Sequence, residues 1–335
     1  MIKRVRLLAV GSLFVAMCGL WAQDTPKVKA PAWKQGMELQ VRKVGEKDFT
    51  KDTKRYGVEV YKDENTGKVL YITETGSVAV INEGKSTGVK DKAPEWKHGM
   101  ELQVRKAGEK EFTKTTKTFS IECFYDPVNS TLIYITEIGS IAVVPVDKKP
   151  DDSKDVAPKW MEAMELQARK AGETDFTKDT AKYGVEVFQD ENNKNLIYIS
   201  DVGSIAVVPE KKVNPGGKYP WIYAMELRVR KAGDPDFNKD TPKWGVEVFF
   251  DDPTGNGVYL SQTGAISVGT GIPDKAIEKS KPPVWLHGME MQARKAGEAE
   301  FSKTTKRYSV EVFHDENSGN LIYATEAGAV PVVKK

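Results

Sequence analysis

Residues 132–144 read "LIYITEIGSIAVV", and closely similar strings occur at 69–81, 196–208, 257–269 and 321–333. In each string an apolar run is followed by a short segment with a glycine and then by a second apolar run. This pattern is typical of two antiparallel strands joined by a tight turn, in which glycine supplies a left-handed backbone conformation. The chain therefore contains one hairpin in five versions.

The hairpin is the second half of a longer repeat. In the first copy Met37, Leu39 and Val41 alternate with polar residues, and Val58 and Val60 do so further on. A period of two predicts half-buried antiparallel strands. We therefore predict an all-β protein, in which each repeat is a small four-stranded antiparallel meander. The predicted segments are a signal peptide over 1–22, β repeats over 31–82, 94–145, 158–209, 219–270 and 283–335, and polar linkers over 83–93, 146–157, 210–218 and 271–282.

Two arrangements of the repeats compete. Long linkers rich in Lys, Asp, Pro and Gly favour separate modules joined as beads, and we take this as the first prediction. Small units without disulfides favour packing against one another, and five four-stranded units can close into a five-bladed β-propeller, which is the alternative. The hairpin 132–144 also resembles the strand–turn–strand hairpins of propeller proteins. Pro331 lacks a backbone donor and predicts that the fourth strand is an edge.

The N-terminus predicts export. A basic start, "MIKRVR", is followed by a short apolar stretch that ends "GLWA", which indicates a signal peptide cleaved after Ala22. Lipid attachment at Cys18 is the alternative. We expect a secreted, periplasmic or cell-surface protein with no transmembrane segment in the mature chain.

Cleavage would also change the charge and the cysteine content. The segment 1–22 carries three basic and no acidic residues, so 47 basic residues would face 48 acidic ones in the mature chain. Without a long basic block, we expect no nucleic-acid binding. Cys123 would be the one remaining cysteine, at the repeat position where Val60, Val187, Val248 and Val312 stand. We predict that it is a small buried apolar residue and that the mature chain forms no internal disulfide.

Three charged positions recur in every repeat. By alternation we predict that they project together from an exposed sheet face, that the first repeat's Arg42 pairs with its own Glu59, and that this face either is simply solvated or serves as a docking surface. The residues are Glu38, Arg42, Glu59, Glu101, Arg105, Glu122, Glu165, Arg169, Glu186, Glu226, Arg230, Glu247, Glu290, Arg294 and Glu311.

Two aromatic positions also recur. We predict that they are structural and close the small core of each unit, with an exposed stacking platform for sugar rings as the alternative for the tryptophans. The residues are Trp33, Trp96, Trp160, Trp221, Trp285, Phe49, Phe112, Phe176, Phe237 and Phe301.

The sequence carries no motif for catalysis or for a cofactor. Segments such as "DENTG" (63–67) lack the spaced carboxylates of a calcium loop and predict turns. His98 and His287 share one repeat position, where the other copies have Gln35, Glu162 and Tyr223, and no pair of histidines has metal-ligand spacing. We therefore expect no enzyme activity, no metal and no cofactor.

Repetition of a whole unit, joined by hydrophilic spacers, predicts an exported non-catalytic protein that binds multivalently at or outside the cell surface. The expected partner is a protein or polysaccharide of the cell envelope. The alternatives are a passive spacer or surface-coat component, and a lectin-like propeller that binds carbohydrate.

Overall fold

The computed structural model of the chain describes residues 28–83, 92–151, 156–209, 213 and 217–335. The predicted signal peptide and Cys18 lie outside these residues. The described residues form strands and connecting loops without any helix, which confirms the all-β prediction.

The strands form five antiparallel sheets, each of four strands consecutive in the chain. We call these sheets blades 1 to 5. Blade 1 contains β1 (Ala32–Val41), β2 (Lys54–Lys62), β3 (Lys68–Thr73) and β4 (Val78–Asn82), and blade 2 contains β5 (Glu95–Val104), β6 (Lys117–Asp126), β7 (Thr131–Thr136) and β8 (Ile141–Pro145). Blade 3 contains β9 (Lys159–Ala168), β10 (Ala181–Gln189), β11 (Leu196–Ser200) and β12 (Ile205–Val208). Blade 4 contains β13 (Trp221–Arg228), β14 (Lys243–Asp251), β15 (Asn256–Ser261) and β16 (Ile266–Gly269), and blade 5 contains β17 (Val284–Ala293), β18 (Lys306–Asp315), β19 (Asn320–Thr325) and β20 (Val332–Lys334).

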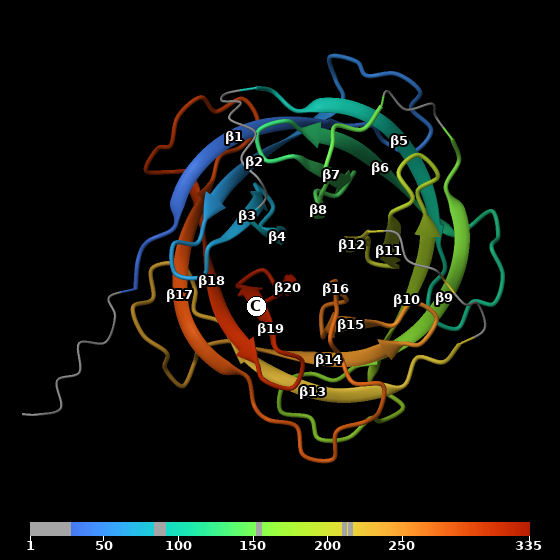
Figure 1. Cartoon of the computed structure of the whole chain (residues 1–335), viewed down its shortest axis with the longest axis vertical. Coiled ribbons are helices and arrows are strands. Elements are labelled where there is room, and N and C mark those ends of the chain that lie inside the picture. The colour runs from blue at the N-terminus through green and yellow to red at the C-terminus, as the bar shows by residue number, and fades with distance from the viewer. Residues whose placement is uncertain (1–27, 84–91, 152–155, 210–212, 214–216) are drawn as a thin grey trace, which may run out of the picture.

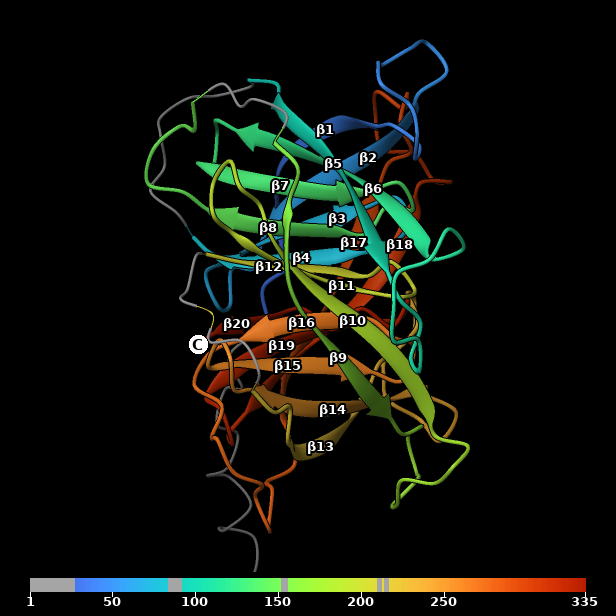
Figure 2. The same ribbon diagram turned by 90° about the vertical axis from the view of Figure 1, so that its right-hand side faces the viewer.

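The five blades stand around one axis and form a β-propeller (Figure 1). The first strand of each blade lies on the rim, and the fourth strand lies next to the axis, where it is the sheet edge expected from Pro331. Figure 2 shows the ring from the side, with the strands of each blade running between its two faces. The fourth strands enclose a narrow central space of about 70 Å³.

Serine hydroxyls join neighbouring fourth strands at the axis. The backbone N–H of Ile141 donates to Oγ of Ser77 on the preceding blade at 3.2 Å, and the N–H of Ile205 donates to Oγ of Ser140 at 3.2 Å. The N–H of Ile266 donates to Ser204 in the same way at 3.0 Å. These bonds satisfy donors of inner strands whose edges no further strand covers.

The hydrophobic cores lie between blades and not within them. Tyr56, Val58 and Val60 of blade 1 pack with Ile133 and Ile135 of blade 2 in one cluster. Alternate residues of blade 1 point the other way and pack with blade 5. Because both faces of a blade are covered, β7 is buried at every position. The propeller, given as the alternative arrangement, is confirmed, and the preferred arrangement of independent beads is wrong.

The hairpin glycines belong to this packing. Gly76 has φ of +88°, in the left-handed region where glycine is favoured, as the sequence indicated. A Cβ atom there would lie 2.4 Å from the ring of Tyr308 on the preceding blade. The turn that ends each third strand is therefore also a close contact between blades.

Candidate binding sites at the blade seams

We call the contact between two neighbouring blades a seam and name it by its blades, so that seam 5/1 lies between blade 5 and blade 1. A β-bulge near the start of β1 supplies side chains to two seams. Trp33 pairs with Tyr61 and Gln35 with Val60, so one extra residue lies between them. Residues two apart normally share a face of a strand, and a bulge removes that relation. Trp33 therefore contacts blade 5, whereas Gln35 contacts Asp126 of blade 2.

Seam 5/1 carries a compact group of four side chains. Nε of Arg294 donates to Oε1 of Glu59 at 2.6 Å, and its Nη2 donates to Oε2 at 3.1 Å. The indole Nε1–H of Trp33 donates to the same Oε2 at 2.7 Å, and Phe301 meets the indole edge to face. The Arg294 guanidinium also lies 4.7 Å from the Phe301 ring centre and 5.8 Å from that of Trp33. A bidentate ion pair that packs against two aromatic side chains thus joins the last blade to the first.

The same group recurs at all five seams, and we call it the rim cluster. In every copy the arginine and phenylalanine come from the earlier blade and the tryptophan and glutamate from the later one. The members are Arg42, Phe49, Trp96 and Glu122; Arg105, Phe112, Trp160 and Glu186; Arg169, Phe176, Trp221 and Glu247; Arg230, Phe237, Trp285 and Glu311; and Arg294, Phe301, Trp33 and Glu59.

The arginine also fixes the long loop after the first strand. Nη1 of Arg42 donates to the carbonyl of Lys47 at 2.5 Å, and Phe49 at the far end of the loop packs on Trp96 of blade 2. Phe49 therefore anchors the loop, and its anchor point lies on the next blade.

The predicted exposed charged face is wrong for two of its three positions. Glu59 and its counterparts Glu122, Glu186, Glu247 and Glu311 are no more than 1% exposed, because the preceding blade covers the sheet face that the sequence assigned to solvent. Arg42 pairs with Glu122 of the next blade and not with Glu59 of its own. The third position is exposed as expected, at Glu38, Glu101, Glu165, Glu226 and Glu290.

The prediction that the recurring tryptophans and phenylalanines close the cores is also wrong. Trp33 is 48% exposed and Trp96 is 40% exposed, and Phe112 is 39% exposed. The bulge turns each tryptophan to the rim, where its N–H holds the glutamate, its ring contacts the phenylalanine and arginine of the preceding blade, and part of the indole faces solvent. The exposed aromatic platform, given as the alternative, is the placement that the structure has.

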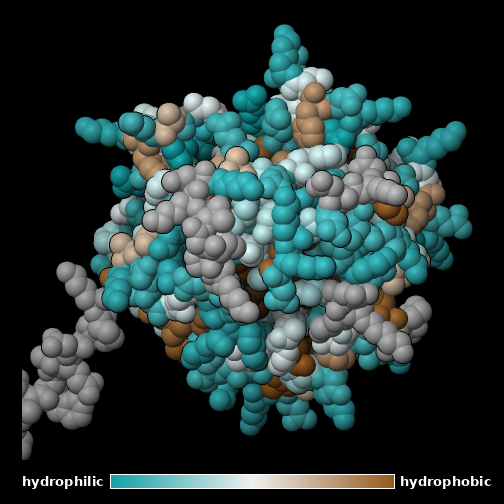
Figure 3. Space-filling model, turned by 45° about the horizontal axis from the view of Figure 1, so that its top comes forward, coloured by the Kyte–Doolittle hydropathy of each residue, from teal (hydrophilic) through white to brown (hydrophobic). Residues whose placement is uncertain are grey.

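Grooves lie beside the rim clusters. At seam 5/1 a hollow of about 480 Å³ is lined by Trp33, Glu38 and Arg294 together with the linker residues Lys92 and Pro94. At seam 3/4 a hollow of about 350 Å³ is lined by the corresponding arginine and glutamates and by linker residues from blade 4 to blade 5. A third, of about 270 Å³, lies at seam 2/3. In the view of Figure 3 the surface is mainly hydrophilic, with small separate hydrophobic spots.

A second repeated group lies inside each seam, around the aspartate that begins the turn between the second and third strands. We call it the buried aspartate site. Oδ1 of Asp63 accepts the N–H of Asn65 and Oδ2 accepts the hydroxyl of Thr66, so these segments form the predicted turns. Oδ2 also accepts the hydroxyl of Tyr323 from the preceding blade at 3.1 Å. The other four aspartates, each of which also accepts a tyrosine hydroxyl from the preceding blade, are Asp126, Asp190, Asp251 and Asp315.

The residue opposite each aspartate differs from seam to seam. This is the repeat position of Gln35, His98, Glu162, Tyr223 and His287. Gln35 donates to Asp126 at 2.9 Å, and the two histidines lie 2.8 and 3.0 Å from their aspartates. Tyr223 donates its hydroxyl to Asp315 at 2.5 Å.

The pKa of the buried aspartate is shifted in opposite directions at seams 5/1 and 3/4. Burial alone would raise the pKa of Asp63, but hydrogen bonds from His287 and Thr66 hold it well below its usual value. At seam 3/4 burial, followed by the charge of Asp251, raises the pKa of Glu162 from 4.5 to about 7. Burial likewise raises the pKa of Asp251. Oε1 of Glu162 and Oδ1 of Asp251 lack a hydrogen-bond partner. This seam therefore holds two carboxyl groups that favour sharing a proton.

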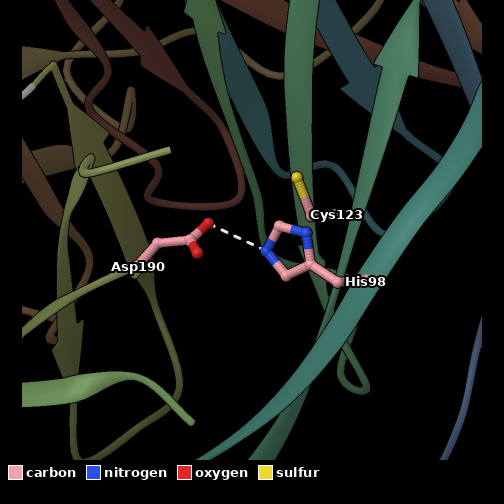
Figure 4. Close-up of side chains that lie close together, drawn as sticks. All are labelled: His98, Cys123 and Asp190. Carbon is pink, nitrogen blue, oxygen red and sulfur yellow. Dashed lines mark hydrogen bonds and ion pairs between the residues drawn. The ribbon is translucent and has the colours of Figure 1, made fainter. Parts of the chain in front are cut away.

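Seam 2/3 contains the free cysteine. Cys123 is fully buried, as predicted, and burial raises the pKa of its thiol well above the usual value. It pairs across the sheet with His98, whose Nε2 lies 2.8 Å from Oδ2 of Asp190 (Figure 4). The ligand-type atoms of the three side chains all lie within 4.8 Å of one another. The histidine spacing in the sequence gave no sign of this group, and only the cross-strand register and the ring bring it together.

Comparison with known proteins adds little to this description. No model of a known protein family matches the chain, and no curated protein matches it. Among solved structures, selenomethionine-substituted virginiamycin B lyase from Staphylococcus aureus matches with 10% identity over 90% of this chain and 88% of that chain. The TM-score is 0.12, so this likeness carries no argument. Within the described residues, no helix is long and apolar enough to cross a membrane.

Proposed function

We propose that this propeller is an exported, non-catalytic binding protein that engages a carbohydrate of the cell envelope through its rim. The observation that carries the proposal is the half-exposed tryptophan beside a groove at seam 5/1, repeated around the ring as an exposed or partly exposed indole. An indole that is held through its N–H and exposes about half of its surface offers an apolar area for stacking against a sugar ring. Glu38 and Arg294 line the same groove and offer hydrogen bonds to hydroxyl groups.

Multivalency follows from the symmetry. The five rim clusters each present an exposed or partly exposed indole, and a repeating polymer that contacts several of them would bind far more tightly than at one cluster alone. The repetition also supports binding over catalysis, since each site offers the same groups. Export rests on the N-terminal segment, and N-terminal sequencing of the protein recovered from fractionated cells tests it, with a first residue of Gln23 as the expected result.

Fluorescence provides a direct binding test. The chain from Gln23 onward is titrated with neutral, amino and acidic oligosaccharides, and binding should protect the rim tryptophans from acrylamide quenching. Trp33→Ala should remove one site in five, with retention of the ring checked by its thermal melt. Trp244→Phe is the control and should keep all sites, because Trp244 packs against the core between blades 4 and 5 and lines none of the three grooves described above. Absence of saturable binding by every sugar class would reject the proposal in favour of a passive coat or spacer.

A further inference from the structure

The inner part of seam 2/3 contains a set of potential metal ligands that its neighbours lack. His98 and Asp190 are each 1% exposed and Cys123 is fully buried. Figure 4 shows Nε2 of the His98 ring facing Asp190, with Cys123 beside the ring on the Nδ1 side. The Nδ1 atom is buried and has no hydrogen-bond partner. An unpaired buried polar atom is costly, so the site is incomplete as a purely structural hydrogen-bond network.

Seam 5/1 is an internal comparison for this site. There His287 lies 3.0 Å from Asp63, with the same geometry as the pair at seam 2/3. The residue paired across the sheet with His287 is Val312, whereas His98 is paired with Cys123. A histidine–aspartate pair is thus compatible with an apolar neighbour, and the sulfur is the addition that distinguishes seam 2/3.

We propose that His98, Cys123 and Asp190 form a closed structural site for a divalent metal ion of the zinc class, which ties blade 2 to blade 3. One imidazole nitrogen, one thiolate sulfur and one carboxylate oxygen are ligand types that zinc accepts. The thiolate and the carboxylate together neutralise the charge of the ion, so that no net charge is buried. The metal would displace the thiol proton, because thiolate is the ligand form.

The surroundings fit a closed site. The three ligand atoms lie within 4.8 Å of one another. Because Nε2 faces Asp190 and Nδ1 faces the cysteine side, binding of one ion requires the imidazole to turn until a single nitrogen faces both Cys123 and Asp190. The hydroxyl of Tyr134 donates to Oδ2 of Asp190 at 2.9 Å and so holds this carboxylate in place. With every ligand buried, substrate has no place on the ion, and the role is to hold the seam.

Cobalt is the probe for this site. The chain from Gln23 onward, in which Cys123 is the one thiol, is stripped with a chelator and titrated with Co²⁺ alone. We expect one equivalent to produce a near-ultraviolet thiolate-to-cobalt charge-transfer band and the visible bands of a tetrahedral ion. Zinc should displace the cobalt and raise the melting temperature. Lack of a thiolate band at one equivalent would overturn the proposal, even if further metal binds at the surface.

Variants copied from the other seams locate the site. Cys123→Val reproduces seam 5/1 and should abolish the band and weaken zinc binding by about 100-fold or more. His98→Gln reproduces seam 1/2 and should also lose the band, which keeps the test decisive if one variant folds poorly. His287→Gln is the matched control and should bind one equivalent unchanged. Zinc affinity that persists in both folded seam 2/3 variants would contradict the assignment.

Discussion

The outer and inner parts of each seam follow different rules. On the outside, the rim cluster keeps the same arginine, glutamate, tryptophan and phenylalanine at all five seams, with Arg Nε to Glu Oε1 distances of 2.6 to 2.7 Å. Inside, the aspartate and tyrosine recur, but the residue facing them changes from Gln35 to His98, Glu162, Tyr223 and His287. The rim cluster joins neighbouring blades in the same way at every seam. The partner of the buried aspartate varies between the seams.

The rim cluster is constant and the buried aspartate site varies because the two sites differ in how many partners each charged group has. A buried bidentate ion pair needs both partners, since loss of one leaves a desolvated charge without compensation. The inner aspartate has several other donors from its own turn and from the tyrosine, so that its last partner can vary without unfolding the seam. Substitutions at the two places should therefore differ in size and in kind.

The largest effect is expected at the rim cluster. Glu122→Ala leaves the guanidinium of Arg42 and the indole N–H of Trp96 without their buried acceptor. We expect a loss of about 3–5 kcal/mol in the free energy of unfolding, measured by denaturant titration. Glu101→Ala removes an exposed glutamate from the same blade and should cost less than about 1 kcal/mol. Equal losses in the two variants would show that the buried pair does not hold the seam.

The next effect depends on pH and belongs to seam 3/4. Because the pKa of Glu162 is raised from 4.5 to about 7, the folded chain binds a proton more tightly than the unfolded chain. Stability from this group is therefore fully present below about pH 4.5 and is lost as the pH rises through about 7. Glu162→Gln, which copies Gln35, should remove that slope and stabilise the protein at pH 8 by on the order of 2 kcal/mol. Thermal melts across this pH range measure it.

The reverse exchange controls that experiment. Gln35→Glu places a second carboxyl group beside Asp126 at seam 1/2, where Gln35 now donates a hydrogen bond at 2.9 Å. The variant should acquire the loss of stability between about pH 4.5 and 7 that we expect of the natural chain at seam 3/4. An unchanged pH profile in both variants would disprove the shared-proton description of Glu162 and Asp251.

A smaller effect is expected where an inner site loses one of several donors. Tyr71 donates its hydroxyl to Asp126 at 3.0 Å, but Gln35 and Asn129 donate to the same carboxylate oxygen. Tyr71→Phe should therefore lower the free energy of unfolding by about 1 kcal/mol, as denaturant titration would show. A loss as large as that of Glu122→Ala would mean that the inner and outer contacts are equally indispensable.

The sequence predicted the blade better than the ring. The period of two and the hairpin glycine predicted four antiparallel strands, and Gly76 has the left-handed conformation that was expected. The apolar runs of the third and fourth strands, such as "LIYIT" in β7, also contained a signal for burial on both faces, since a half-buried strand alternates instead. Burial on both faces of a sheet favours the propeller over independent beads, because only neighbouring blades can cover both faces.

The sites were harder to predict because they depend on two features absent from any one repeat. The bulge after Trp33 sends that residue and Gln35 to different seams, and no local pattern in the sequence marks the extra residue. The partner of Arg42 stands in the next copy, at Glu122, and alternation within one copy cannot distinguish it from Glu59. The repeats in the sequence marked the recurring positions, and the arrangement of the blades in the ring determines which residues they contact.

The smallest effect concerns Cys123, and it separates packing from metal binding. Valine occupies the same position in the other four blades, and Val60, Val187, Val248 and Val312 are each fully buried there. In chelated protein Cys123→Val should therefore change the free energy of unfolding by less than about 1 kcal/mol, because the two side chains are of similar size and apolar. In the presence of zinc the natural chain should melt at a higher temperature than the variant, and the gap should close when chelator is added. A gap that survives chelation would show that the sulfur contributes through packing, and the inner part of seam 2/3 would then be no more than a variant of seam 5/1.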